Sequence, residues 1–246
     1  MDNLIRGIRV LHQNAIRIEA DGRVLYFDPY GVQGAPHDAD YIFVTHDHYD
    51  HFSPGDIGRV SKAGTTLVVP ESARAAAEAV GLAVLPVQVG QSAALPGVSF
   101  RTVPAYNLNK KFHPRAKDWV GYVAELGGGI YYIAGDTDAT PEARAVRCDV
   151  ALLPIGGTYT MDAEEAADLA RQLPQLAENL APLFEKLKSR LLALAERLPD
   201  GLGTGLRAGV EEFFKTGAGF GTKLYETLFS WASGIIGRLP DAVLFA

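Results

Sequence analysis

The segment at residues 46–51, His-Asp-His-Tyr-Asp-His, places three histidines and two carboxylates directly after the apolar run YIFVT at 41–45. Neutral imidazole and carboxylate are the side chains that bind Zn²⁺, Mn²⁺ or Fe²⁺ in proteins. A tight loop at a strand end turns alternate residues inward, so we expect His46 and His48 to reach one ion, with Asp50 and His51 facing a second. A solvated polar loop is the alternative, and it is disfavoured because unpaired ligand groups are costly to bury beside an apolar strand.

Strand-like runs surround this segment and are expected to position it. Asp21-Gly22 separates two of these runs and is a strong hairpin signal. Many strands with few helices between them indicate packed sheets with helices outside. The expected strands lie at 8–13, 15–20, 23–29, 41–45, 66–70, 82–89, 98–105, 120–126, 130–135 and 150–155, and the expected helices at 54–62, 71–80 and 162–172.

The chain changes character after residue 172. Leucines recur every three or four residues from Leu173 to Leu198, opposite a face rich in charged residues, which is typical of amphipathic helices. All six histidines lie before residue 114, and the net charge of −6 falls within residues 1–172, because acidic and basic residues are equal in number afterwards. We therefore predict a domain at 1–172 and an amphipathic helical tail at 173–246.

The overall composition excludes several protein classes. With 246 residues, 48% of them hydrophobic, the chain can bury a sizeable core. Its net charge of −6 argues against a general nucleic-acid binder. A single cysteine, Cys148, rules out an internal disulfide and fits a reducing compartment. Because no signal peptide or transmembrane span is evident, we predict a cytoplasmic protein.

The pattern His46-x-His48-x-Asp50-His51 resembles the metal-binding signature of the metallo-β-lactamase-fold hydrolases. Asp28-Pro29 before it and Gly135-Asp136-Thr137 after a strand follow the family's order. The flanking segments THDHYDHFSPGDI, YIAGDTD and LLPIGGTYTMDAEEAA resemble a bacterial branch of metal-dependent hydrolases, over about residues 1–170. The resemblance implies an α/β fold, a four-layer αββα sandwich, with the family's closing segment replaced here by α-helices.

The resemblance also implies roles for individual residues. His46 and His48 would hold the first metal, and Asp50 and His51 the second. Asp136 would bridge the two ions. Asp50 is in addition the candidate catalytic residue, because it could orient a metal-bound hydroxide or transfer a proton.

This sequence departs from the family pattern at two places. The family supplies another histidine near VPAYN, where this chain has Tyr106 and Asn107, and His113 is the nearby substitute. The family also ends a later strand with a histidine that completes the second metal site, whereas no histidine follows residue 113 here. His113 is therefore a tentative ligand, and the second site is expected to be weakened.

Other residues are candidates for the pocket or for the structure around it. Tyr106, Asn107 and Thr158 are the candidates for substrate binding, although turn and core roles are equally compatible with them. His12 falls in a strand-like run, which favours a structural role. His37 lies in a polar loop near the rim of the expected pocket.

The leading functional hypothesis is a metal-dependent hydrolase that uses a metal-bound hydroxide on a small ester, lactone or phosphoester. Its cofactor would be one or two Zn²⁺ ions, with Mn²⁺ or Fe²⁺ as alternatives. The competing hypothesis is a metal-binding but catalytically impaired protein whose helical tail contacts a partner or a membrane surface. A nuclease is a third option, made less attractive by the acidic domain at 1–172.

Overall fold

A computed structural model describes residues 2–173, 188–194, 196–197, 207 and 210–211 of the chain. The chain divides into two compact units, the first of which extends to residue 176. Residues 188–194 are helical, and the rest of the predicted tail lies largely outside the described residues. The domain boundary at 172/173 stays a prediction. No helix among the described residues is both long and apolar enough to cross a membrane.

Two β-sheets form the first unit, and both contain the strands that the hydrophobic runs predict. The strands are β1 (Ile8–His12), β2 (Ala15–Ala20), β3 (Arg23–Phe27), β4 (Ala39–Phe43), β5 (Ser61–Pro70), β6 (Ala83–Val87), β7 (Ser92–Leu95), β8 (Val98–Pro104), β9 (Val120–Leu126), β10 (Gly129–Ile133) and β11 (Val150–Leu152). The helices are α1 (Asp2–Ile5), α2 (Pro54–Val60), α3 (Arg74–Glu78), α4 (Pro141–Arg144) and α5 (Ala163–Gln172), with 3₁₀ turns η1 (Glu71–Ala73) and η2 (Arg115–Lys117).

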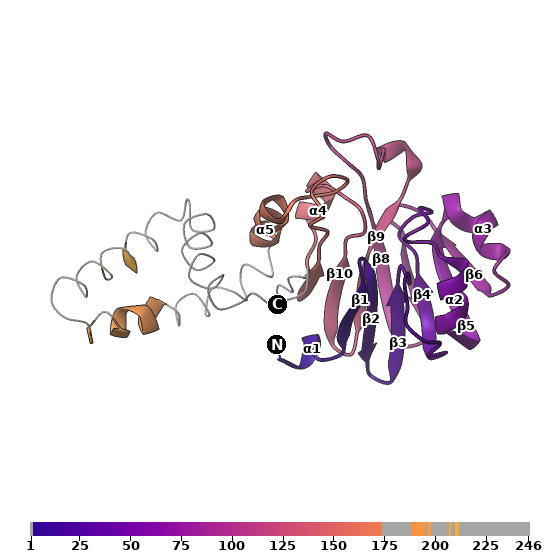
Figure 1. Ribbon diagram of the computed structural model, residues 1–246, viewed down its shortest axis with the longest axis horizontal. Coiled ribbons are helices and arrows are strands. Elements are labelled where there is room, and N and C mark those ends of the chain that lie inside the picture. The colour runs from indigo at the N-terminus through magenta and orange to yellow at the C-terminus, as the bar shows by residue number, and fades with distance from the viewer. Residues whose placement is uncertain (1, 174–187, 195, 198–206, 208–209, 212–246) are drawn as a thin grey trace. The chain divides into compact units, whose positions relative to one another are not determined.

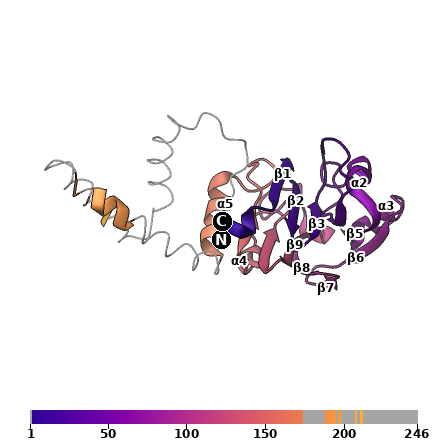
Figure 2. The ribbon, with the colours of Figure 1, turned by 90° about the horizontal axis from the view of Figure 1, so that it is seen from below.

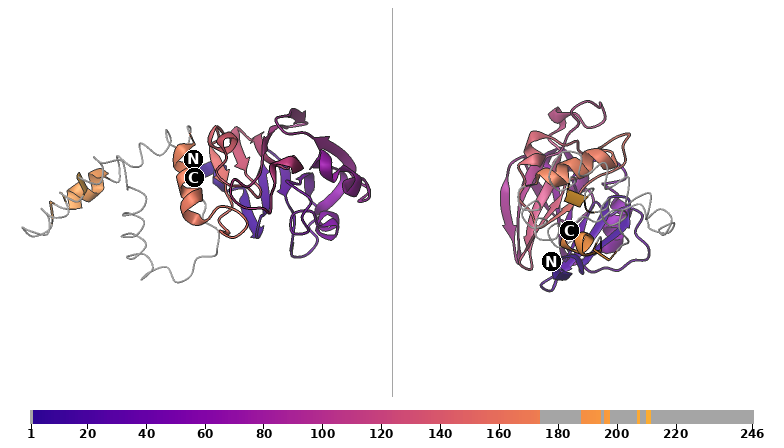
Figure 3. Two further views of the ribbon diagram at one scale, coloured as in Figure 1. Left: turned by 90° about the horizontal axis from the view of Figure 1, so that it is seen from above. Right: turned by 90° about the vertical axis from the view of Figure 1, so that its left-hand side faces the viewer.

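The strand order in the sheets brings several carboxyl ends to one edge. The first sheet has the order β1-β2-β3-β4-β5-β6, and β3 to β6 run parallel. The second sheet has the order β11-β10-β9-β8-β7, with only β10 and β11 parallel. Parallel strands end at the same edge, so the loops after β3 and β4 are neighbours. Figure 3 shows the strands of the two sheets as separate layers.

Three apolar clusters hold the layers together. Between the sheets, Phe27 and Phe43 of the first sheet pack with Phe100 and Tyr122 of the second, with ring centroids 5.1–6.2 Å apart. The alternate side chains along each strand point to the outer face of the sheet, where they pack against the helices. This arrangement confirms the predicted αββα sandwich.

Each outer face is covered by its own pair of helices (Figures 1 and 2). On the first sheet, Ile57 and Val60 of α2 and Ala77 of α3 pack with strand residues such as Ile42 and Leu67. On the second sheet, α4 and α5 pack over the outward side chains of β8 to β11. The predicted capping box begins α5, where Asp162 accepts from the Glu165 backbone and Glu165 accepts from that of Asp162.

The structure differs from the sequence prediction in several short elements. The helix predicted at 54–62 ends at Val60, because Ser61 already begins β5. The helix predicted at 71–80 is a 3₁₀ turn followed by five helical residues. The strand β7 (SAAL) and the helix α4 (PEAR) were not predicted, because four residues are too few to show a period.

Candidate metal centre

The candidate site lies where loops leave the carboxyl ends of β3, β4 and β10. Asp28 follows β3, the segment 45–51 follows β4, and Asp136 follows β10. Gly135 lets the last of these loops pass close to Thr45. Its φ is +64°, and a Cβ there would lie 2.9 Å from the Thr45 Cβ, so only glycine fits.

Asp28 anchors the histidine segment to the first sheet. Its carboxylate accepts hydrogen bonds from the Thr45 backbone N–H and the Thr45 hydroxyl, both at 2.7 Å. It also lies 2.8 Å from Nδ1 of His51. All three residues are buried. Because the carboxylate is an acceptor, His51 presents Nδ1–H to it and turns Nε2 towards the site.

Three imidazoles form one side of the centre, which we call the histidine half: His46, His48 and His113. Their ligand atoms all lie within 4.8 Å of one another, and Nε2 of His46 is 3.0 Å from Nδ1 of His48. His113, from the loop after β8, is only 2% exposed. Its buried Nε2 has no hydrogen-bond partner among the described residues. The structure therefore brings the tentative residue His113 to the two histidines of the motif.

The other side, which we call the carboxylate half, consists of Asp50, His51 and Asp136. Nε2 of His51 lies 3.5 Å from Oδ1 of Asp136 and 4.0 Å from Oδ2 of Asp50. Asp136 reaches the histidine half as well, since its Oδ2 lies 3.3 Å from Nε2 of His113. Asp136 is thus placed between the two halves, as the bridging role requires.

Asn14, in the turn between β1 and β2, also contacts the carboxylate half. Its side-chain Nδ2 donates to Oδ1 of Asp136 at 2.9 Å and lies 3.3 Å from Nε2 of His51. Asn14 was not among the residues predicted from the sequence. It directly follows Gln13, a turn residue with a φ of +45°, and no motif marks it as part of the site.

The electrostatic environment differs between the two halves. Burial, reinforced by the neighbouring His51, lowers the pKa of His46 well below its usual value. Burial also lowers the pKa of His48. In His51, burial acts in the same direction, but the charges and hydrogen bonds of Asp28 and Asp136 outweigh it and raise the pKa to about 10.

The pKa of Asp136 is depressed although burial opposes its ionisation. The surrounding histidines, His113 and His51 foremost, favour its charged form. Asp136 is therefore a carboxylate throughout the physiological pH range. It can accept a cation without first losing a proton.

Trp119, the residue before β9, forms an aromatic wall beside the histidine half. Its ring centroid lies 4.9 Å from that of His46, 4.7 Å from that of His48 and 5.6 Å from that of His113. The side chain is 4% exposed, and its Nε1 has no hydrogen-bond partner in the described part of the chain. The wall restricts the rotamers of the three histidines and excludes water from their side.

The residues present fit a divalent metal ion. Three imidazoles with a carboxylate at the edge are a donor set typical of zinc. Nε2 of buried His113 makes no hydrogen bond among the described residues and lies 3.3 Å from Oδ2 of Asp136, so a cation beside these two atoms would be bound by both. His46, His48 and His113 would hold one ion. His51 and Asp136, which also group with His46, would face a second, with Asp50 at 4.0 Å from His51.

The three residues predicted to bind substrate are Tyr106, Asn107 and Thr158, and the structure shows what the first two contact. The Tyr106 hydroxyl donates to Glu142 at 2.9 Å, and its ring lies 4.9 Å from the guanidinium carbon of Arg115. Asn107 has its amide hydrogens and its carbonyl oxygen engaged within the protein. The polar groups of both side chains make contacts within the protein, and their role in substrate binding stays a prediction. Thr158 is exposed and stays a prediction.

The two remaining histidines lie outside the cluster. The ring of His12 packs against Tyr30 at 5.7 Å between centroids, in agreement with a structural role. Nδ1 of His37 lies 2.8 Å from the carbonyl oxygen of Ser61.

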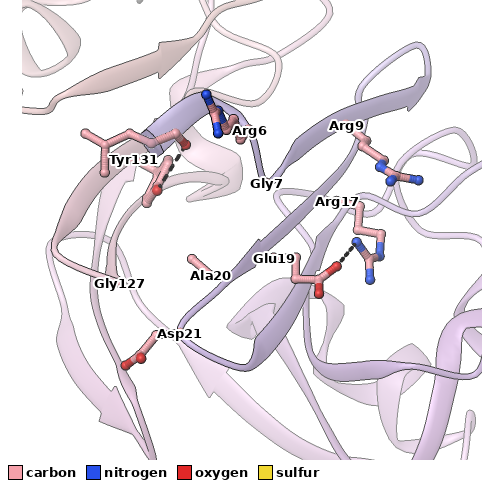
Figure 4. A pocket seen from close by; sticks show the side chains of 10 residues that line it. Arg6, Gly7, Arg9, Arg17, Glu19, Ala20, Asp21, Gly127 and Tyr131 are labelled. Carbon is pink, nitrogen blue, oxygen red and sulfur yellow. Dashed lines mark hydrogen bonds and ion pairs between the residues drawn. The ribbon is translucent and has the colours of Figure 1, made fainter. Parts of the chain in front are cut away.

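A hollow at β1 and β2 contains none of the predicted site residues (Figure 4). There Arg17 donates to Glu19, and Arg6, Arg9 and Asp21 also line the surface.

The comparisons with known proteins agree with this geometry. The family described as the beta-lactamase superfamily domain matches residues 7–176. A UPF0173 metal-dependent hydrolase of Methanosphaerula palustris is 32% identical over 61% of this chain and 71% of its own length. A second, from Thermus thermophilus, is 37% identical over 52% of this chain and 58% of its own length. The chain therefore spans less than two thirds of that relative.

Solved structures show the same fold. Igni18, a metallo hydrolase from Ignicoccus hospitalis, matches with a TM-score of 0.56 and 26% identity, over 68% of this chain and 77% of that protein. An isothiocyanate hydrolase from Delia radicum gut bacteria matches with a TM-score of 0.54, over 68% of this chain and 81% of that one; at 16% identity it supports the fold alone. These findings confirm the predicted resemblance and enzyme class. The chain belongs to the beta-lactamase superfamily domain family, that of the metallo-β-lactamase-fold hydrolases.

Proposed function

We propose that this chain hydrolyses small esters or lactones that carry an apolar group, with a divalent metal held by His46, His48 and His113. The observation that carries the proposal is the buried Nε2 of His113, which makes no hydrogen bond among the described residues and lies beside the two motif histidines and the Asp136 carboxylate. A bound divalent metal would supply a nucleophilic water at neutral pH and would polarise the scissile carbonyl. Zinc suits the imidazole donors, as one ion or two, and the cytoplasm remains the proposed location.

The protein side chains divide the remaining work. Asp136 carries negative charge next to both halves and so orients the cation and the attacking water. Asp50 is partly exposed and lies 4.0 Å from Nε2 of His51, so it can accept a proton from the water and pass it to the leaving group. Trp119 keeps solvent from the side of His46 and His48.

Exposed aromatic side chains that neighbour the ligands along the chain, or contact such a neighbour, support a substrate with an apolar group. Phe112 directly precedes His113, and its ring packs edge-on against Tyr159 at 4.7 Å. Tyr159 is 56% exposed, and Tyr49, between two ligands of the motif, is 76% exposed. Exposed aromatic groups beside a polar centre favour contact with an acyl chain or ring. This favours esters and lactones over phosphoesters.

The test is hydrolysis by the zinc-loaded full chain of p-nitrophenyl esters with increasing acyl length, of aliphatic lactones, and of bis(p-nitrophenyl) phosphate. We expect kcat/KM to rise with acyl length and turnover to be lost in His48→Ala. Turnover of the phosphodiester alone would overturn the proposed substrate class. Bound zinc without turnover of any of these substrates would favour the competing hypothesis, a metal-binding but catalytically impaired protein.

A further inference from the structure

Two loops that face the metal centre are joined by a set of backbone contacts. Oγ1 of Thr137 accepts from the Tyr106 backbone N–H and donates to the Tyr106 carbonyl oxygen, both at 3.1 Å. The Asp138 backbone N–H donates to the same carbonyl at 3.0 Å. One loop carries His113 and the other carries Asp136. The contacts therefore fix these two side chains relative to each other.

Asn107 continues this junction with its side chain. Its Nδ2 donates to Oδ1 of Asp138 at 3.2 Å and to the Tyr159 carbonyl oxygen at 3.0 Å. Both amide hydrogens have acceptors, so the network determines which way the amide faces. Oδ1 consequently points to the other side, where it accepts from the His113 backbone N–H at 2.9 Å.

The orientation of Asn107 determines the tautomer of His113. Nδ1 of His113 lies 3.1 Å from Oδ1 of Asn107, which can only accept. Nδ1 must therefore carry the proton. In a neutral imidazole this leaves the lone pair on Nε2, the atom that faces the histidine half without a hydrogen-bond partner in the described residues.

Asp138 is the charged end of this chain of contacts. Its side chain is buried and accepts from the Leu108 backbone N–H at 2.8 Å and from Nζ of Lys110 at 3.0 Å. Lys110 balances the buried charge, so the carboxylate keeps its acceptor role towards Asn107. An amide at position 138 would have one acceptor oxygen for three donors.

We propose that Asn107 and Asp138 are positioning residues that hold His113 with Nδ1 protonated and Nε2 directed to the metal. This inference rests on the proposed metal-binding role of the histidine half. Partners that orient a ligating imidazole contribute about 10–100-fold to metal affinity. We therefore expect Asn107→Leu and Asp138→Asn each to weaken zinc binding by about 10–100-fold.

The zinc affinity of the full chain is measured by competition with a chromophoric chelator, without reference to turnover. Asp38→Asn is the matched control, because Asp38 accepts from Arg17 and Tyr26 on the first sheet and touches none of the ligands. Its zinc affinity should equal that of the unchanged protein. Thermal unfolding in EDTA verifies that each variant is folded. Unchanged affinity in a folded Asn107→Leu protein would overturn the proposal.

A spectroscopic measurement keeps the proposal testable if either variant fails to fold. In the unchanged protein, loaded with cadmium-113 and labelled with nitrogen-15 at histidine, we expect coupling of cadmium to Nε2 of His113 and a protonated Nδ1. Coupling through Nδ1 would contradict the proposal. Absence of ester hydrolysis together with the expected coupling would instead contradict the proposed substrate class and leave the positioning role intact.

Discussion

The two halves of the metal centre differ in the partners that their ligand atoms already have. In the histidine half, Nε2 of His113 is buried without a hydrogen-bond partner among the described residues, and burial keeps His46 neutral. In the carboxylate half, His51 is held by Asp28, and its Nε2 and Oδ1 of Asp136 both lie near Asn14. A metal entering the histidine half meets ligand atoms that hold no amide hydrogen bond, whereas a metal entering the carboxylate half must displace the hydrogen bond from Asn14 to Asp136. We therefore expect the first ion to bind more tightly.

The largest expected effect concerns Asp28, which supports the carboxylate half. In Asp28→Ala the Thr45 N–H, the Thr45 hydroxyl and the ring of His51 lose a buried acceptor. Breaking a buried charged network in this way costs about 3–5 kcal/mol of unfolding free energy. Urea denaturation in EDTA measures this loss of unfolding free energy. A loss below about 1 kcal/mol would show that solvent replaces the carboxylate.

Trp119→Phe is the matched change beside the histidine half. It keeps an aromatic wall and removes a buried N–H that has no partner in the described residues. Because removing an unsatisfied donor offsets part of the lost packing, we expect a loss of less than about 1.5 kcal/mol. If the loss of unfolding free energy in Trp119→Phe equalled that in Asp28→Ala, the two halves would not differ in how much buried hydrogen bonds stabilise them.

His113→Ala compared with His51→Ala tests the order of metal affinities. His113→Ala should weaken the first zinc equivalent by more than about 100-fold, since loss of a direct ligand should exceed the effect of an outer partner. His51→Ala should leave this first equivalent bound and remove only the second. Isothermal titration with zinc separates the two events. The reverse pattern would assign the tighter site to the carboxylate half.

The zinc affinities of the two halves should also differ in their dependence on pH. The pKa of His51 is raised to about 10, so its imidazole is protonated at neutral pH and must lose a proton before it can bind metal. The affinity for the second ion should therefore rise by about tenfold per pH unit between about pH 7 and 9. His46 has a lowered pKa and binds without releasing a proton, so the affinity for the first ion should be almost constant there.

Proton release provides the measurement. Titrations with zinc in two buffers of different ionisation enthalpy should give about one proton for the second equivalent and almost none for the first. In His51→Ala the remaining first equivalent should still bind with almost no proton release, which controls for other groups. Equal proton release by both equivalents would contradict the difference between the halves.

Packed sheets and the motif could be predicted from local sequence, whereas the four-layer αββα order followed from the family resemblance. The apolar runs of β3, β4 and β10 are typical of buried strands, and the motif residues follow one of them directly. The loops could not be predicted in the same way. His113 lies six residues after Asn107, in the loop that follows β8. The contacts of this loop with the segment at 137–138 hold His113 beside His46.

Residues that support the ligands were the hardest to find from sequence. Asp138 lies two residues after Asp136, and a carboxylate after Gly-Asp-Thr carries no signal of its own. Asn14 is 122 residues from Asp136 along the chain, so their contact depends on the packing of one sheet against the other. Such residues can be identified only from the tertiary structure, which places them beside a ligand.

Asn14 therefore provides the final test of the difference between the halves. Its amide N–H donates to Oδ1 of Asp136, an acceptor atom that a second ion would use. In Asn14→Ala that oxygen becomes available, and because one hydrogen bond to a charged group contributes about 1.5–3 kcal/mol, the second zinc should bind at least about tenfold more tightly. The first zinc should be unaffected. If the second zinc binds more weakly instead, the amide must have turned its oxygen inward to act as a ligand, and Asn14 would then take the place of the histidine that the family supplies from its closing strand.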